Sequence, residues 1–284
     1  MSQLGHLPTL TQPRRPRVLA AQPPGWVLPV GAEVPPARSP VELLATVATR
    51  FARAEATEDL RRGRFGQWCD GVALVRTHRA AFAEHWRRHN GRALAGTGPL
   101  WVVLGDSAAQ GLGAQRPQGG YVGQVHAQLI QQTGQPWRVL NLSSSGATIR
   151  DLFRDQLPRL AALPTAPDLV TCGVGTNDVL RLPLPRVRSM IRTLIEALPD
   201  SAVMLDLPLP EAIWRIGRFA APYIARVNST IHAAARQRRL PVAYVSSHFT
   251  PPWAGKFGPD QFHPSDIGYR DWSRALLQAV PVLV

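Results

Sequence analysis

Cysteine is scarce in this sequence: only Cys69 and Cys172 occur among 284 residues. Two cysteines cannot build a network of disulfides, and these two lack the spacing of a metal site. Cys172 also ends the apolar run 168–172 ("DLVTC"), where a small buried side chain fits better than a reactive thiol. The cysteine content therefore excludes a disulfide scaffold and a cysteine-based metal centre.

Long apolar segments are also missing. No apolar run approaches the roughly 18 residues that a membrane-spanning helix needs. Arginines occur near the N-terminus, but three prolines between residues 23 and 29 interrupt the following apolar stretch before it reaches the length of a secretory signal. We therefore expect a soluble, cytoplasmic protein.

Lysine is nearly absent, because only Lys256 among the 32 basic residues is a lysine. The net charge of +13 is spread along the chain, with 14 basic against 7 acidic residues in 1–98 and 18 against 12 in the rest. No aromatic or groove-reading motif accompanies the arginines, so we interpret the charge as a solvated basic surface and expect no nucleic acid partner. Binding to another polyanion or peripheral contact with an anionic membrane stays open.

Residues 1–40 contain nine prolines and little periodic apolar pattern, which predicts a flexible leader. Residues 41–97 are helical in pattern and form a predicted N-terminal helical extension. Its first helix begins at Ser39-Pro40 and ends at Gly63, by the usual start and stop signals.

A second helix is predicted over residues 71–95. Val75, Phe82 and Trp86 fall on one stripe of this helix, whereas its arginines lie elsewhere. This pattern favours a helix that docks on the main domain, and a basic helix lying on a membrane surface is the alternative.

From residue 98 to 284, short apolar runs alternate with longer helical patterns. The predicted strands are Leu100–Leu104, Arg138–Leu142, Leu169–Cys172, Val203–Leu207 and Val242–Val245. The predicted helices are Tyr121–Gln132, Ile149–Leu160, Val187–Leu198, Phe219–Arg239 and Ile267–Ala279. This alternation, with strands apolar nearly throughout, predicts an α/β domain in which helices cover both faces of a five-stranded parallel sheet.

Chemically useful side chains follow the strands at their carboxyl ends. Ser107 follows the first strand, Gly146 follows the second and Asn177 follows the third, while Asp260 and His263 come after the fifth. Each alone has an ordinary explanation as a turn or a helix cap. Because ligands bind at the carboxyl edge of a parallel sheet, we expect these residues to converge there.

The combination suits acyl transfer. A serine hydroxyl becomes a useful nucleophile when an imidazole accepts its proton, and a carboxylate must hold that imidazole in the correct tautomer. Asp260 lies three residues before His263, within reach of the ring N–H. The N–H groups of Ser107 and Gly146 and the amide of Asn177 are candidate donors to the oxyanion of the tetrahedral intermediate.

These blocks resemble the SGNH (GDSL-type) hydrolases, a family of esterases and lipases. "GDS" at 105–107, Gly146, "GTND" at 175–178 and "DQFH" at 260–263 match the four blocks in order, over residues 99–280. The resemblance implies a flavodoxin-like three-layer α/β/α sandwich, with Ser107 as nucleophile, His263 as base and Asp260 as its partner. It also implies an oxyanion hole from Ser107, Gly146 and Asn177. No metal or organic cofactor is implied.

Other readings of the motifs are weaker. His85 and His89 lie four apart on one helix, but the glutamate of a zinc-binding HExxH motif and a third ligand are missing. "GVGTND" lacks the third glycine of a dinucleotide-binding loop, and no Gly-x-Ser-x-Gly occurs. Asp106 and Asp178 are interpreted as structural hydrogen-bonding residues. A thioesterase, a lysophospholipase and a non-catalytic lipid- or carbohydrate-binding relative remain alternatives.

Aromatic residues in two segments are candidates for lining the substrate pocket. They are Trp214, Phe219, Trp253 and Phe257. Aromatic side chains in loops above a sheet suit an acyl or aryl pocket, although they can equally cap the core. Arg215, Arg218 and Lys256 lie among them, so we expect an anionic head group on a small-molecule or lipid ester to be attracted. The sequence does not indicate an oligomeric state.

Overall fold

The computed structural model describes residues 66–209 and 214–280, with the backbone alone at 66–68 and 214–219. The predicted leader over residues 1–40 and the predicted helix that ends at Gly63 lie outside the described residues. The organisation of the chain before residue 66 therefore stays a prediction.

A parallel sheet of five strands forms the centre of the described domain, in the order β2-β1-β3-β4-β5. The strands are β1 (Leu100–Gly105), β2 (Arg138–Asn141), β3 (Leu169–Gly173), β4 (Ala202–Leu205) and β5 (Val242–Ala243). β1 is buried along its whole length, and so is β4. The strand order is that of the flavodoxin-like sheets.

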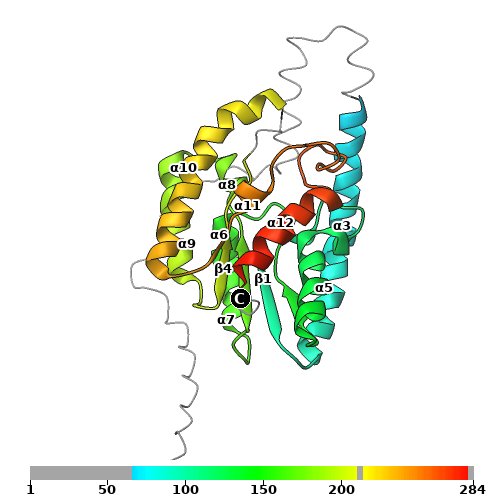
Figure 1. The fold of residues 1–284 in the computed structure, drawn as a ribbon, viewed down its shortest axis with the longest axis vertical. Coiled ribbons are helices and arrows are strands. Elements are labelled where there is room, and N and C mark those ends of the chain that lie inside the picture. The colour runs from blue at the N-terminus through cyan, green and yellow to red at the C-terminus, as the bar shows by residue number, and fades with distance from the viewer. Residues whose placement is uncertain (1–65, 210–213, 281–284) are drawn as a thin grey trace, which may run out of the picture. The chain divides into compact units, whose positions relative to one another are not determined.

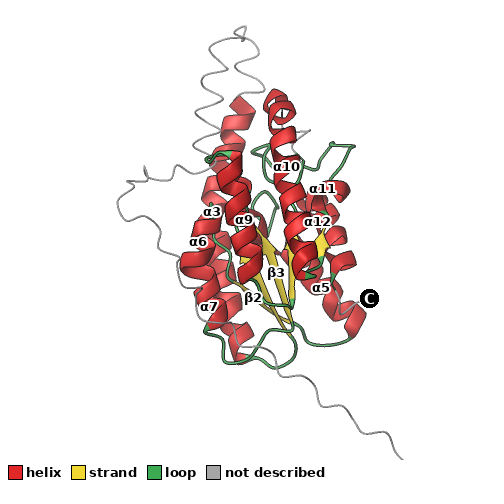
Figure 2. Cartoon of the chain, turned by 90° about the vertical axis from the view of Figure 1, so that its left-hand side faces the viewer, coloured by secondary structure: helices red, strands yellow, loops and turns green. Residues whose placement is uncertain are grey.

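Helices cover both faces of this sheet (Figures 1 and 2). On one face lie α5 (Tyr121–Thr133) and α12 (Asp266–Ala279). On the other lie α9 (Leu184–Ala197) and α10 (Trp214–Arg238), together with α6 (Ile149–Asp151), the π-helical turn η3 (Leu152–Gln156) and α7 (Leu157–Ala161). The result is the predicted three-layer α/β/α sandwich.

The alternation of side chains along β1 explains why two apolar cores form. Trp101 and Val103 join the core beneath α5 and α12, whereas Val102 and Leu104 join the core beneath α9 and α10. Successive residues of a strand point to opposite faces, so a strand with apolar residues throughout must be covered on both sides.

Short helical turns connect the strands to the longer helices near the carboxyl edge of the sheet. They are α4 (Ser107–Gln110), η2 (Pro117–Gly119), α8 (Thr176–Val179) and α11 (Val245–His248). α4 and α8 begin two residues after β1 and three residues after β3, so each of these turns starts almost directly from a strand end.

The long helix α3 (Gly66–Ala95) lies along the edge strand β2. The Asn90 side chain donates to the Asn141 carbonyl (2.7 Å) and accepts from the Asn141 N–H (2.8 Å). A strand edge otherwise exposes unpaired backbone groups, and Asn90 satisfies two of them. The predicted stripe also lies inward, because Val75, Phe82 and Trp86 are all buried.

Several predicted boundaries need correction. β5 ends at Ala243, and Val245 begins α11 instead of ending the strand. The single helix predicted over 149–160 is interrupted by the π-helical turn η3. α10 begins at Trp214, five residues before the predicted start at Phe219, so Trp214 belongs to a helix and not to a loop. Within the described part of the chain, no helix combines the length and apolar composition that crossing a bilayer requires.

Candidate active site

Ser107 is the first residue of α4 and follows the carboxyl end of β1. The Asp106 side chain caps this short helix by accepting a hydrogen bond from the Ala108 N–H at 3.0 Å. A capping aspartate of this kind satisfies one of the free N–H groups at a helix start. It also fixes the turn that places the Ser107 hydroxyl at the edge of the sheet.

The structure brings Ser107, His263 and Asp260 together. His263 Nε2 lies 2.9 Å from Ser107 Oγ, and His263 Nδ1 lies 2.6 Å from Asp260 Oδ2. The tautomer that satisfies both contacts carries its proton on Nδ1 and presents a free Nε2 to the hydroxyl. All three side chains are buried, so these contacts form away from bulk water.

A tight turn holds the Asp260 carboxylate in place. Asp260 Oδ1 accepts hydrogen bonds from the Phe262 N–H (3.1 Å) and the His263 N–H (3.0 Å), while Oδ2 faces the imidazole. Local bonds from an aspartate to the next backbone groups are typical of such turns. They explain why a spacing of three residues is enough to orient the ring.

Electrostatics in this pair favour a charged imidazolium. Burial alone lowers the pKa of His263, but the charge and hydrogen bond of Asp260, together with the charge of Asp106, outweigh burial, so the pKa lies above the ordinary 6.5. Burial alone raises the pKa of Asp260, but the charge and hydrogen bonds of His263 bring it below its ordinary value. Asp260 therefore stays ionised and stabilises the proton that His263 would accept.

Gly113 allows the segment after α4 to pass against the His263 turn. A Cβ at this position would lie 2.6 Å from the His263 Cβ and 2.5 Å from the Pro264 carbonyl oxygen. Its φ of +93° is also a conformation that other residues rarely adopt. The glycine after the Gly-Asp-Ser motif therefore brings the nucleophile segment and the histidine turn into direct contact.

Two backbone N–H groups near Ser107 lack acceptors within the described residues. They belong to Ser107 itself and to Gly146, for neither of which a protein acceptor is present. Gly146 has a φ of +81°, a left-handed conformation that glycine adopts without strain. Unpaired N–H groups at such an edge can stabilise a developing oxyanion.

Asn177, at the start of α8, differs from these two donors. Its Nδ2 atom donates to the Ala147 carbonyl at 2.9 Å and to Asp106 Oδ2 at 3.3 Å. Both amide hydrogens therefore have protein acceptors in this structure. A role for Asn177 as an oxyanion donor requires one of these bonds, most simply the longer one, to give way to substrate.

Asp106 and Asp178 both act as hydrogen-bond acceptors for buried groups, as the sequence predicts. Burial raises the pKa of Asp106 to about 6 and that of Asp178 to about 7. Asp178 accepts the Ile149 N–H with both oxygens, at 3.1 and 3.3 Å. It thereby fixes the start of α6 behind the Gly146 loop.

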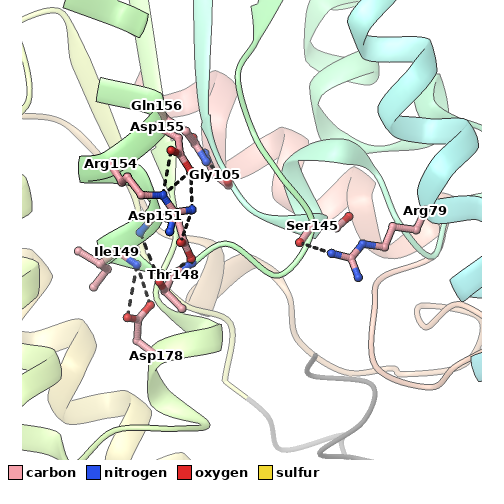
Figure 3. A network of polar contacts seen from close by, with 10 residues as sticks. All are labelled: Arg79, Gly105, Ser145, Thr148, Ile149, Asp151, Arg154, Asp155, Gln156 and Asp178. Atoms are coloured by element: carbon pink, nitrogen blue, oxygen red, sulfur yellow. Dashed lines mark hydrogen bonds and ion pairs between the residues drawn. The ribbon is translucent and has the colours of Figure 1, made fainter. Parts of the chain in front are cut away.

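Gln156, in η3, is a site-supporting residue that the sequence did not indicate. Its side chain accepts from the Gly105 N–H (2.9 Å) and donates to the Gly105 carbonyl (2.8 Å), as Figure 3 shows. Gly105 is the last residue of β1, two positions before Ser107. Pairing with β2 extends only to Val103, whereas pairing with β3 continues to Gly105 itself. Gln156 therefore satisfies backbone groups of the strand end that β2 does not reach, and the Gly105 carbonyl also accepts from the Ser144 N–H at 3.3 Å.

The structure describes the side chains of two of the four aromatic residues that are candidates for substrate binding. Trp253 and Phe257 pack against the buried Phe249, at centroid distances of 5.3 and 5.4 Å. Their contacts are thus with the core beneath α12. The side chains of Trp214 and Phe219 lie outside the described residues, so their role in substrate binding stays a prediction.

Lys256 does not have the role that the sequence suggested. Its Nζ lies 2.5 Å from Asp271 Oδ2 and donates to the Thr250 carbonyl, and both ionic side chains are largely buried. An ammonium group held in this way cannot reach an anionic head group. Lys256 therefore anchors the loop before Asp260 to α12, and Arg215 and Arg218 lie where no side chain is described.

A cavity of about 570 Å³ opens between α3 and the loop that carries Gly146. Trp86 and Asn90 line it from α3, and residues 142–147 line it from the loop. Neither Ser107 nor His263 lines it. Among the described residues, no group of three or more His, Cys, Asp or Glu side chains is arranged to hold a metal ion.

A parallel α/β sandwich with serine, histidine and aspartate in hydrogen-bond contact at its carboxyl edge has the architecture of a serine hydrolase. The model of the GDSL-like lipase/acylhydrolase family matches residues 103–270, which is more than half of the chain. The chain belongs to this family of ester hydrolases.

Solved structures with the same fold include esterases. TesA has 21% sequence identity and a TM-score of 0.54, over 65% of this chain and 99% of its own. The acetylxylan esterase Axe2 from Geobacillus stearothermophilus has 22% identity and a TM-score of 0.51, over 66% and 95%. LAE5, an α/β hydrolase enzyme from the metagenome of Lake Arreo, has 19% identity and a TM-score of 0.53, over 66% and 96%. A search of curated proteins gave no match.

Proposed function

We propose that the protein hydrolyses carboxylic esters through a covalent acyl-enzyme on Ser107. The observation that carries this proposal is the continuous chain of contacts from Asp260 through His263 to Ser107 Oγ, at 2.6 and 2.9 Å. Each contact lies within the range expected of a catalytic hydrogen bond. Family membership supports the same chemistry.

The first half of the reaction forms the acyl-enzyme. Ser107 Oγ attacks the ester carbonyl as its proton passes to His263 Nε2, and Asp260 stabilises the resulting imidazolium. The carbonyl oxygen becomes an oxyanion that the N–H groups of Ser107 and Gly146, and the Asn177 amide, would stabilise. His263 then donates its proton to the leaving alcohol, and the C–O bond breaks.

The second half releases the acid. His263 takes a proton from water as the water oxygen attacks the acyl-enzyme carbonyl, and the same donors stabilise the second oxyanion. Collapse returns the proton to Ser107 Oγ and frees the carboxylic acid. No step needs a metal ion or an organic cofactor.

The proposed substrate is a small-molecule or lipid ester with a short to medium acyl chain. Thioester hydrolysis would use the same residues, since only the leaving group differs. Peripheral membrane contact, a cytoplasmic location and the lack of a nucleic acid partner stay predictions from the sequence.

Hydrolysis of p-nitrophenyl esters from acetate to palmitate tests this function. We expect turnover by the wild type to favour the shorter chains and to be abolished in Ser107→Ala. Turnover in Ser107→Ala close to that of the wild type would place the chemistry elsewhere. A wild type that binds esters without hydrolysing them would identify a non-catalytic relative.

A further inference from the structure

The helix α3 contacts all three segments that carry the proposed active site, although it precedes the family match at residues 103–270. Trp86 Nε1 donates to the Gln110 carbonyl of the nucleophile helix α4 at 3.0 Å. Arg79 Nη2 donates to the Ser145 carbonyl in the Gly146 loop at 2.9 Å (Figure 3). α3 also passes close to the turn that holds Asp260.

That third contact depends on a glycine within the helix. A Cβ on Gly71 would lie 1.9 Å from the Pro259 carbonyl oxygen, so only glycine allows the helix to approach the Asp260 turn this closely. Glycine inside a helix costs about 1 kcal/mol relative to alanine. Its presence here has a packing reason, which indicates that α3 is fitted to the active-site segments.

The Arg79 contact falls on the peptide that joins Ser145 to Gly146. The carbonyl of Ser145 and the N–H of Gly146 belong to the same planar unit and point in opposite directions. The hydrogen bond from Arg79 to the Ser145 carbonyl therefore also fixes the direction of the Gly146 N–H. That N–H is the one that would face the oxyanion.

This peptide is the central unit of a turn. Ala147 N–H donates to the Ser144 carbonyl at 3.0 Å, and Gly146 has a φ of +81°. These features define a type II turn over residues 144–147. A type I turn with the same hydrogen bond differs by about 150° in the ψ of Ser145 and about 170° in the φ of Gly146, so it reverses the central peptide. Glycine can adopt both conformations.

This turn borders open space, although the Ser145 side chain is buried. Ser144 is exposed, Gly146 is partly exposed, and the loop borders the cavity of about 570 Å³. Neighbouring groups are held by other residues. Gln110 donates to the Ser143 carbonyl and accepts from the Ser145 hydroxyl, and Asn177 donates to the Ala147 carbonyl. Among the described residues, the side chain that donates to the central Ser145–Gly146 peptide is Arg79, which bonds to the Ser145 carbonyl.

We propose that Arg79 is a positioning residue, which holds the Ser145–Gly146 peptide in the orientation that presents the Gly146 N–H to the oxyanion. The guanidinium bond stabilises the type II turn over its reversed form, and the positive charge polarises the peptide in the direction that strengthens its N–H as a donor. This inference rests on the proposed function, since it concerns the oxyanion of that reaction.

Kinetics of full-length Arg79→Ala with p-nitrophenyl acetate test the proposal. Removing one oxyanion donor costs about 10²–10³ in kcat. Arg79→Ala keeps the Gly146 N–H but allows its peptide to reverse in a fraction of the molecules, so the loss should be smaller. We therefore expect kcat to fall about 5- to 20-fold with KM within about twofold of the wild type. Inhibition by a trifluoromethyl ketone, whose adduct carries an oxyanion, should weaken by the same factor.

Arg87→Ala is the matched control, because Arg87 lies on the same helix, pairs with Glu84 and is 76% exposed. It should retain wild-type kcat and inhibition. An unchanged kcat in Arg79→Ala, or a raised KM alone, would overturn the proposal. Loss of activity in both variants together with a lower melting temperature would also overturn it, in favour of a general structural role for α3.

A double-mutant cycle tests the route of the effect. If Arg79 acts through the Gly146 peptide, adding Arg79→Ala to Gly146→Ala should cost less than about twofold in kcat. Full additivity would contradict this route. A wild type without Ser107-dependent hydrolysis would instead overturn the proposed function, so the two failures are distinguishable.

Discussion

The Ser107 hydroxyl lies 2.9 Å from His263 Nε2, although 156 residues separate them in the chain. The sheet explains how they meet, because Ser107 follows the carboxyl end of the interior strand β1 and His263 lies just before α12, one of the helices that cover the sheet. Only the neutral imidazole can accept the hydroxyl proton, so the activity of this pair should depend on the protonation of His263.

The pH profile of kcat/KM tests this dependence. The pKa of His263 lies above 6.5, so His263 is protonated and inactive as a base below that pKa. We expect kcat/KM for p-nitrophenyl acetate to rise with pH and to reach half its plateau above pH 6.5. Asp260→Asn removes the charge that raises the pKa, so its midpoint should move to lower pH while kcat falls by about 10³ or more. An unshifted midpoint would contradict the assigned pair.

Asn177→Ala separates the two roles of that residue. As an oxyanion donor, Asn177 should contribute about 10²–10³ to kcat with little effect on KM. As a buried partner of Asp106 and of the Ala147 carbonyl, it should also stabilise the fold by about 1–3 kcal/mol. Steady-state kinetics and urea unfolding of the same variant measure both. A loss of stability with unchanged kcat would leave only the structural role.

Gln156→Leu should destabilise the fold strongly for a residue outside the hydrophobic core. The substitution keeps the approximate volume but leaves the buried N–H of Gly105 without its acceptor, while the Gly105 carbonyl keeps only the Ser144 N–H at 3.3 Å. We expect the free energy of unfolding to fall by about 1–3 kcal/mol in urea titrations. Gln128→Leu, at an exposed position on α5, is the control and should change the free energy of unfolding by less than about 0.5 kcal/mol. Equal effects would show that Gln156 is not needed at the strand end.

Lys256→Met tests whether Lys256 stabilises the fold and takes no part in substrate recognition. Breaking a buried ion pair costs about 3–5 kcal/mol of folding stability. Because Arg274 remains 3.4 Å from Asp271 and still offsets its charge, we expect the free energy of unfolding to fall by about 3 kcal/mol, near the lower end of that range. Lys256 should contribute nothing to recognition of anionic esters. The ratio of kcat/KM for an anionic and a neutral ester of equal chain length, measured at two salt concentrations, should match the wild type. A changed ratio would restore Lys256 to substrate recognition.

The sequence predicted the strands and their end residues well, because those features are local. A buried strand such as Leu100–Leu104 is an unbroken apolar run, and Gly-Asp-Ser directly follows it. The contacts that support the site were not predictable in this way. Arg79 on an exposed helical face and Gln156 within a helical pattern gain their partners only when segments 66 and 51 residues away fold beside them.

Two further misjudgements have the same origin. The loop neighbours of Lys256 suggest a role in substrate binding, whereas its partner Asp271 lies on α12. The helical pattern of 149–160 gives no sign of the π-helical turn, whose geometry directs Gln156 to Gly105. Local patterns identify elements and motif residues, but an ion pair or a side-chain contact to a strand end depends on tertiary proximity.

Mass spectrometry of the protein after reaction with a fluorophosphonate ester tests the central claim most directly, because such reagents react far faster with an activated serine hydroxyl than with an ordinary one. The account predicts one covalent adduct per chain, located on Ser107, and its loss in Ser107→Ala and His263→Ala. An adduct on any other residue, or labelling of Ser107 that persists at the wild-type rate in His263→Ala, would contradict it.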